Sequence, residues 1–334
     1  MREREPAARV TVADEGRGPA ARRFARSAMA TVFEVHCVHP DAGYAGQAAQ
    51  EAFAVLDRLE RELSRFLPNS DISRISALRA GDSVGVSPST MECLALARRM
   101  HAATAGAFDV SIGTGLERLE LLEDELTVRA GSAGVSLDLG GIGKGYAVDR
   151  MAEVLVEWGV ERALVHGGFS SVLALEAPPG HDGWSLSLSA PSADTPAVLA
   201  RVSARRRAFS ASGTRKGAHI RDPRTGLAVR RPAAWAALDV PPPDDGPAEA
   251  WTKDLARSPA ALAESLSTAF MILDASSVAD LCARHPEVEA WLLLERDARE
   301  RAGGPAVVHF GRPNPAEPGA DAPIPSWHQP PDRR

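Results

Sequence analysis

Lysine is nearly absent from this 334-residue sequence. It occurs only at Lys144, Lys216 and Lys253, and every other basic residue is arginine. Together with the abundant alanine, this pattern indicates a genome-wide bias in composition. Lys144 therefore stands out, because this rare residue lies inside a glycine-rich motif.

Cysteine and long apolar runs are also scarce. The three cysteines, Cys37, Cys93 and Cys282, are widely spaced and form neither a metal-type pair nor a disulfide framework. The N-terminus has no apolar region of the kind found in secretory signals. No run of about 18 apolar residues occurs, so we expect no membrane span. The simplest expected location is the cytoplasm.

The bulk composition is that of an ordinary globular protein. Hydrophobic residues make up 44% and charged residues 25% of the chain. The formal net charge of −6 gives no reason to expect general nucleic-acid binding. A chain of this length can bury a large core in one domain or in two.

Turn and periodicity signals predict a single α+β domain over residues 24–311. Residues 1–23 are interpreted as a disordered leader, and the proline-rich residues 312–334 as a loose tail. Helices are expected at 45–66, 70–75, 88–103, from the glycine motif to 158, 259–273 and 276–285. Strands are expected at 26–38, 135–139, 184–189, 199–203, 208–213, 288–294 and 306–310, and residues 163–175 are expected to form two strands joined at Gly167-Gly168. Residues 116–134 are interpreted as an irregular surface excursion. Clustered strands between a few long helices favour antiparallel sheets.

The most distinctive stretch is Asp138-Leu139-Gly140-Gly141-Ile142-Gly143-Lys144-Gly145-Tyr146-Ala147-Val148-Asp149. Glycines allow a backbone to approach a ligand closely, and the helix start behind them offers free N–H groups to an anion. The stretch therefore points to a phosphate-containing ligand near residues 138–146. It matches neither common nucleotide fingerprint, and a glycine-rich strand-to-helix turn explains it equally well.

Three weaker patterns could carry chemistry. Residues 201–231 hold ten basic residues and one acid, which fits an anionic partner or a solvated face. Glu264, Ser267 and Thr268 share one helix face and could bind a hard cation such as Mg²⁺, although a solvated face is the commoner explanation. His219 and Asp222 could form a general base and its partner, but such a pair is more often structural.

Taken in order, several motifs resemble the ApbE family, the FAD:protein FMN transferases. The likeness spans roughly residues 27–297. The motifs are Met29-Ala30-Thr31-Val32-Phe33, Leu63-Ser64-Arg65-Phe66, Ser70-Asp71-Ile72-Ser73-Arg74, Gly106-Ala107-Phe108-Asp109, the glycine motif, Ser212-Gly213, His219-Ile220-Arg221-Asp222-Pro223-Arg224-Thr225-Gly226 and Glu264-Ser265-Leu266-Ser267-Thr268-Ala269. The resemblance implies an ApbE-like, T-fold-like α+β domain.

The resemblance also implies an activity and a site. FAD would be split at its pyrophosphate with the help of Mg²⁺, FMN would be attached to a Thr or Ser hydroxyl of a target flavoprotein, and AMP would leave. Gly141, Glu264, Thr268 and, less directly, Ser267 would hold the metal. The FAD site would be lined by Met29, Phe66, Ala107, Phe108, Asp109, Asp138, Lys144 and Ile220. His219 would activate the acceptor hydroxyl with support from Asp222.

This sequence departs from the family pattern at several of these positions. Glu264 stands where the metal-binding helix usually opens with Asp, and Phe66 stands where Tyr is common. The rival interpretations are an FAD pyrophosphatase in which water is the acceptor, a non-catalytic FAD-binding protein, and a module that binds an anionic partner through residues 201–231.

Overall fold

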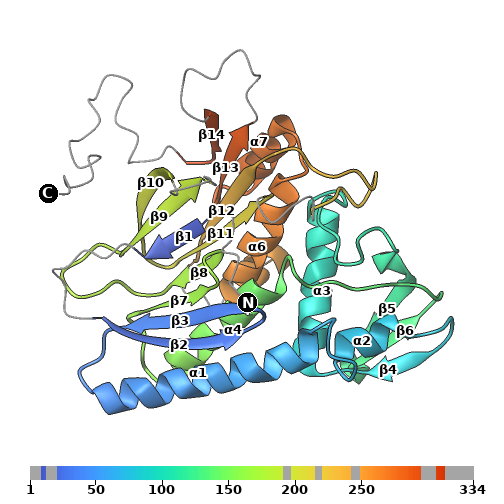
Figure 1. Cartoon of the computed structure of the whole chain (residues 1–334), viewed down its shortest axis with the longest axis horizontal. Coiled ribbons are helices and arrows are strands. Elements are labelled where there is room, and N and C mark those ends of the chain that lie inside the picture. Colours follow the sequence, from blue (N-terminus) through green and yellow to red (C-terminus); the bar gives the residue numbers. More distant parts are fainter. Residues whose placement is uncertain are drawn as a thin grey trace, which may run out of the picture.

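A computed structural model describes residues 9–12, 21–190, 197–214, 220–241, 249–294 and 306–312. At its centre lies an eight-stranded antiparallel sheet with the order β14-β13-β12-β11-β8-β7-β3-β2 (Figure 1). These strands are β2 Arg22–Ala28, β3 Thr31–Cys37, β7 Ala163–Gly167, β8 Ser171–Ala174, β11 Arg207–Gly213, β12 Ala233–Asp239, β13 Val288–Leu294 and β14 Ala306–Phe310. The predicted α+β class with antiparallel sheets and packed helices is confirmed.

Helices cover one face of this sheet, where α4 contacts β7 and β8 and α6 contacts β11 and β12. The helices are α1 Ala42–Leu63, α2 Asp71–Ser76, α3 Pro88–Ala103, α4 Gly143–Glu157, α5 Ala250–Arg257, α6 Pro259–Phe270 and α7 Ala275–Arg284. The first begins at Asp41, whose side chain accepts hydrogen bonds from the N–H groups of Gly43 and Tyr44. Its buried stripe has the helical spacing that the sequence predicted.

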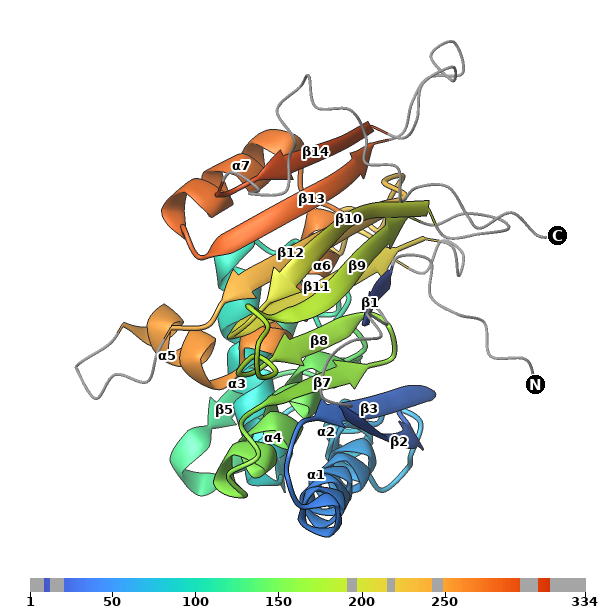
Figure 2. The same cartoon turned by 90° about the vertical axis from the view of Figure 1, so that its left-hand side faces the viewer.

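The opposite face carries a second sheet, formed by β1 Arg9–Val12, β9 Trp184–Ala190 and β10 Ala197–Ala204 (Figure 2). Leu186, Phe209 and Trp235 belong to the apolar core between the two sheets. Because β12 is covered on both sides, its sequence Ala-Ala-Trp-Ala-Ala shows no polar alternation, and this strand was not predicted.

Residues 119–130 are not the irregular excursion that was predicted. They form β5 Leu119–Leu122 and β6 Thr127–Ala130, which complete a small sheet with β4 Ser83–Gly85. The 3₁₀ helices η1 Leu116–Arg118 and η2 Glu123–Glu125 flank β5. Figure 1 shows this sheet beside α2 and α3. The expectation failed because the strands are only four residues long and interrupted by acidic turns.

Four other elements differ from the prediction. The strand expected at 26–38 is a hairpin, which turns at Met29 and Ala30 with φ of 49° and 56°. Residues 135–139 form no strand, because the N–H of Leu137 bonds to Ser76 and that of Asp138 to the carbonyl of Val110. Within the predicted leader, residues 9–12 pair with β9 as β1, and helix α5 was missed.

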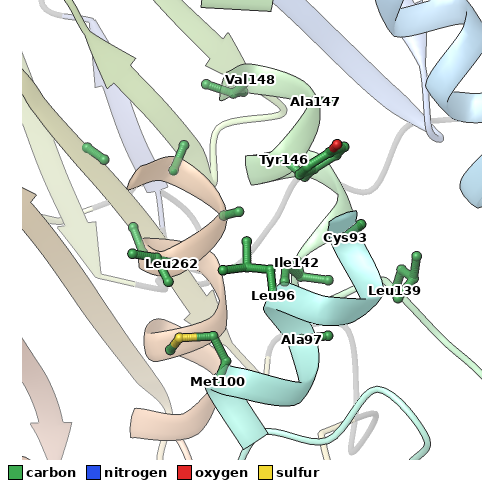
Figure 3. Packing of buried hydrophobic residues seen from close by; sticks show 14 of the residues in the cluster. Cys93, Leu96, Ala97, Met100, Leu139, Ile142, Tyr146, Ala147, Val148 and Leu262 are labelled. Carbon is green, nitrogen blue, oxygen red and sulfur yellow. The ribbon is translucent and has the colours of Figure 1, made fainter. Parts of the chain in front are cut away.

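The main core lies between the sheet and the helices. Figure 3 shows Leu96 and Met100 of α3, Ile142 before α4 and Leu262 of α6 filling the space where these helices meet. The helices therefore form a rigid support for the loop that carries the glycine motif. Among the residues that the structure describes, none of the helices has the length and apolar character to cross a membrane.

Candidate functional site

A cavity of about 350 Å³ lies beside the start of α4. Segments that are far apart in the sequence line it: the loop after α3, the glycine motif, the end of β11, the loop from Ile220 onward, and α6. Its lining consists of Ala107, Phe108, Asp109, Val110, Ile112, Asp138, Gly140, Gly141, Lys144, Ser170, Ala211, Ser212, Gly213, Ile220, Arg221, Pro223, Glu264, Thr268 and Ile272.

The glycines of the motif let the backbone approach α6. A Cβ on Gly145 would lie 2.2 Å from the carbonyl oxygen of Ala260, so no larger residue fits there. A Cβ on Gly141 would lie 3.2 Å from both the Phe108 ring and the Thr268 hydroxyl. The motif is therefore needed for close helix packing as well as for an open backbone beside the cavity.

Helices α4 and α6 cap each other. The N–H groups at the N-terminus of α4 donate no hydrogen bond to a side chain at its own N-cap position. Instead, the buried carboxylate of Glu264 on α6 accepts a hydrogen bond of 2.7 Å from the N–H of Gly145. In return, Asp149 on α4 accepts hydrogen bonds of 2.8 and 2.9 Å from the N–H groups of Ala260 and Ala261. Each carboxylate thus meets the positive end of the other helix.

Asp149 is almost fully buried, with 1% of its surface exposed. Burial raises the pKa of this carboxyl above its ordinary value, whereas the charge of Arg150 and the two N–H donors favour the ionised form. The geometry of the crossing therefore depends on a carboxylate that is almost fully shielded from solvent.

The second oxygen of Glu264 forms an ion pair with Lys144. The ammonium of Lys144 also donates a hydrogen bond of 3.1 Å to the carbonyl of Gly140. The side chain of Glu264 is 4% exposed and that of Lys144 is 23% exposed. The pair therefore forms part of the cavity wall, with the positive charge on the open side.

Hydroxyl groups extend the α6 wall toward β11. Thr268 lines the cavity, and its hydroxyl donates to the carbonyl of Glu264 at 3.0 Å. The Ser267 hydroxyl is buried, 3.2 Å from that of Ser210 and 2.9 Å from that of the lining residue Ser212. Ser210 and Ser212 lie two residues apart on β11, so their side chains point to the same face of the sheet, toward α6. Of the two predicted hydroxyl ligands, only Thr268 borders the cavity.

The two acids predicted to face a flavin nucleotide both line the cavity, but they bond within their own loops. Asp109 accepts from the N–H and hydroxyl of Ser111 and from the N–H of Gly113, at 2.7–2.8 Å. Asp138 accepts from the N–H of Gly140 at 2.9 Å and pairs with Arg65 at 3.1 Å. Their carboxylates therefore fix the shape of the cavity mouth.

Ile112 is a lining residue that the sequence did not reveal. Its φ of +50° is strained for a β-branched side chain. The Asp109 hydrogen bonds hold this loop, and the adjacent Gly113 touches the carbonyl of Pro223, where a Cβ would lie only 2.6 Å away. The apolar side chain of Ile112 is nevertheless 49% exposed at the cavity. Strain of this kind often marks a ligand-binding position.

Some predicted site residues lie away from the cavity lining. Met29 lies in the β2–β3 turn, where its N–H donates to Glu60 at 2.6 Å. Phe66 is 79% exposed, and its ring contacts the guanidinium of Arg65, which pairs with the lining residue Asp138. Phe66 is therefore connected to the mouth of the cavity through Arg65.

Of the predicted catalytic pair, only Asp222 can be located, because His219 lies outside the described residues. Asp222 does not line the cavity. Both of its carboxylate oxygens accept hydrogen bonds of 2.9 Å from the guanidinium of Arg224. This side-chain hydrogen bond lowers the pKa of Asp222. The neighbouring residues Ile220 and Arg221 do line the cavity.

Three arginines of the basic stretch 201–231 pair with acids from elsewhere in the chain. Arg205 and Arg206 pair with Glu176, and Arg207 pairs with Asp239 and Glu289. These contacts favour the interpretation of an ordinary charged surface for this part of the stretch.

Besides Ile112, the sequence missed Ser170, Ser212 and Arg221 as lining residues. Ser212 and Arg221 lie within motifs that had been noted, but nothing in their spacing assigned them to a cavity. Within the described ranges, no group of three or more His, Cys, Asp or Glu side chains is arranged to hold a metal ion. An ion at this site would depend on one carboxylate, hydroxyls and backbone carbonyls.

Comparisons with known proteins agree with this architecture. The ApbE family model matches residues 29–120 and 114–292. The FAD:protein FMN transferase of Salmonella typhimurium is 25% identical over 257 residues, and the match covers 63% of this chain and 71% of that protein. A protein of the same name from Vibrio cholerae is 25% identical over 214 residues, and the match covers 52% of this chain and 63% of that protein.

Solved structures show the same fold. The apo form of the flavinyl transferase ApbE from Pseudomonas stutzeri is 22% identical, with a TM-score of 0.70 over 89% of this chain and 96% of that one. The ApbE protein of Thermotoga maritima is 19% identical, with a TM-score of 0.69 over 87% of this chain and 97% of that one.

Proposed function

The chain belongs to the ApbE family, and we propose that it transfers FMN from FAD to a Thr or Ser hydroxyl of a target flavoprotein and releases AMP. The observation that carries this proposal is the meeting of the glycine motif, Lys144, Glu264 and Thr268 around one cavity. Two segments that lie 120 residues apart in the sequence, measured from Lys144 to Glu264, thus supply backbone, positive charge and oxygen donors together.

The cavity has a polar and an apolar part that suit the two halves of such a substrate. Gly140, Gly141 and the ammonium of Lys144 lie at the start of α4, where N–H groups and the helix dipole favour phosphate. Phe108, Ile220 and Ile272 supply apolar surface for ring systems. We assign the pyrophosphate to the first group and the rings to the second.

The donor set fits Mg²⁺ by its chemistry, since it consists of oxygen atoms. Glu264, Thr268 and the carbonyl of Gly141 would hold the ion, and Ser267 would orient the α6 wall from behind through Ser212. When bound, Mg²⁺ would offset negative charge on the pyrophosphate. Both oxygens of Glu264 are already engaged by Lys144 and Gly145, so the ion would bind only after a rearrangement.

Transfer requires an acceptor hydroxyl to attack the phosphorus of the FMN moiety. The new bond joins the acceptor oxygen to that phosphorus, the bridging pyrophosphate bond breaks, and AMP carries away the bridging oxygen. The acceptor proton would pass to His219. Asp222 would contribute through Arg224 by shaping the loop that presents Ile220 and Arg221 to the cavity.

A titration that follows flavin fluorescence tests the first step. The wild-type protein should bind FAD, and Thr268→Val should retain the fold while losing most FMN transfer. Lys253→Met, on the exposed side of α5, is the matched control and should behave as wild type. Absence of FAD binding by the wild-type protein would refute the proposal. Release of free FMN and AMP without a modified acceptor would instead identify a pyrophosphatase.

A further inference from the structure

Both carboxylate oxygens of Glu264 have a partner within the protein. One carboxylate oxygen accepts the N–H of Gly145 at 2.7 Å, and the other pairs with Lys144. The same ammonium is held at 3.1 Å by the carbonyl of Gly140, in the motif that begins the cavity wall. Lys144 therefore places a positive charge at the carboxylate to which a divalent ion would bind.

The length of the Glu264 side chain accounts for this arrangement. An Asp at this position would end one carbon–carbon bond, about 1.5 Å, earlier. Its carboxylate could then not reach the Gly145 N–H, which is 2.7 Å from Glu264. The extra methylene therefore converts a residue on the cavity wall into a cap for α4 and a partner for Lys144.

We propose that Lys144 and a divalent cation compete for Glu264, so that the ion binds only when the ammonium is displaced. This inference rests on the proposed metal-dependent function. Two positive charges cannot share one buried carboxylate without strong repulsion. Lys144 therefore lowers the affinity of the ligand-free protein for the ion.

The displaced ammonium remains beside Gly140 and Gly141, where the substrate phosphates are assigned. A phosphate there gives Lys144 a new anionic partner and reduces the cost of leaving Glu264. Ion and substrate binding are then positively coupled, and by linkage each strengthens the other. Lys144 acts as a positioning residue that makes tight ion binding depend on the presence of the phosphates.

A Mn²⁺ titration followed by electron paramagnetic resonance, without FAD, tests the competition. Lys144→Met should bind Mn²⁺ roughly tenfold or more tightly than wild type, because the competing charge is gone. Lys253→Met should match the wild type. Equal or weaker binding by Lys144→Met, or no Mn²⁺ binding by any of these proteins, overturns the proposal.

Glu264→Asp provides an independent test that keeps both charges. Its shorter side chain should release Lys144 and also tighten Mn²⁺ binding, and adding Lys144→Met to it should give little further gain. A full additional tenfold gain in the double variant contradicts the mechanism. FAD affinity measured without metal separates the two proposals: loss of FAD binding by the wild type defeats the proposed function, whereas normal FAD binding with unaltered Mn²⁺ affinities defeats only the competition.

Discussion

The N–H of Gly145 donates a hydrogen bond of 2.7 Å to the carboxylate of Glu264, and this bond joins the start of α4 to the middle of α6. The two helices pack directly against each other, and Lys144 and Glu264 at their contact line the cavity. Their separation is fixed at one end by this bond and at the other by Asp149, which receives two N–H groups from the start of α6. The geometry of the site thus depends on two reciprocal caps.

Gly145→Ala should disrupt both folding and ligand binding. The added Cβ would lie 2.2 Å from a backbone oxygen of α6, so the helices must separate. We expect a loss of at least about 2 kcal/mol in unfolding free energy, as for overpacked cores. Thermal denaturation and FAD titration measure the two effects. Gly46→Ala in α1 is the control, because its Cβ meets only ordinary contacts at 3.7 Å. Equal stability of the two variants would contradict the close crossing.

Asp149→Asn should lower both the stability of the protein and its affinity for FAD. The amide would present its NH₂ group to one of the two N–H donors at the start of α6, which costs about 1–3 kcal/mol in stability. FAD affinity should fall as well, since α6 carries Glu264 and Thr268. Asp41→Asn at the cap of α1 is the control: Asn caps a helix about as well as Asp, so stability and FAD affinity should both stay close to those of the wild type. The helix-docking role fails if both variants bind FAD like the wild type.

Replacing Ile112 by Gly should lower FAD affinity without lowering stability. Replacement by Gly relieves the strain of a φ of +50°, so the melting temperature should rise or stay constant. FAD affinity should fall, because apolar surface at the cavity is lost. Ile112→Ala keeps most of the backbone strain and should lose affinity without the gain in stability. Unaltered FAD affinity in both variants would show that Ile112 does not contact the ligand.

Glu34 should make the free energy of unfolding depend on pH, independently of the ligand-binding site. Burial alone would raise the pKa of this carboxyl, but hydrogen bonds from Arg23 and His36 lower it to about 2. Its contribution is therefore complete above its unfolded pKa of about 4.5 and is lost as the pH falls toward 2. Allowing for solvent around Arg23, this is roughly 2 kcal/mol.

Denaturant unfolding at several pH values, comparing wild type with Glu34→Gln, measures this contribution. The wild type should lose more stability than the variant between pH 4.5 and 2, and FAD affinity at neutral pH should be the same for both. Parallel stability curves would show that the Glu34 contacts contribute nothing.

The sequence predicted the long elements because their signals are local. The helix stripe of α1 and the paired strands around Gly167 and Gly168 follow from side-chain periodicity and turn residues. It failed where an element depends on its surroundings. The buried strand β12 has no polar alternation, and the β2–β3 turn at Met29 and Ala30 contains no glycine.

The same distinction applies to the site. Motif order brought Phe108, Lys144 and Thr268 to one cavity, and the structure places all three there. The pairing of Lys144 with Glu264, and the engagement of Asp222 by Arg224, depend on side-chain reach across separate elements. No spacing along the chain encodes such contacts, so the sequence could not show which candidate side chains are already occupied.

The mass of an acceptor flavoprotein after incubation with this protein, FAD and Mg²⁺ tests the proposed transfer most directly. The acceptor should gain the mass of FMN on a Thr or Ser residue, with one AMP released per modified acceptor, and Thr268→Val should abolish most of both signals. An acceptor of unchanged mass beside intact FAD would contradict the proposed transfer.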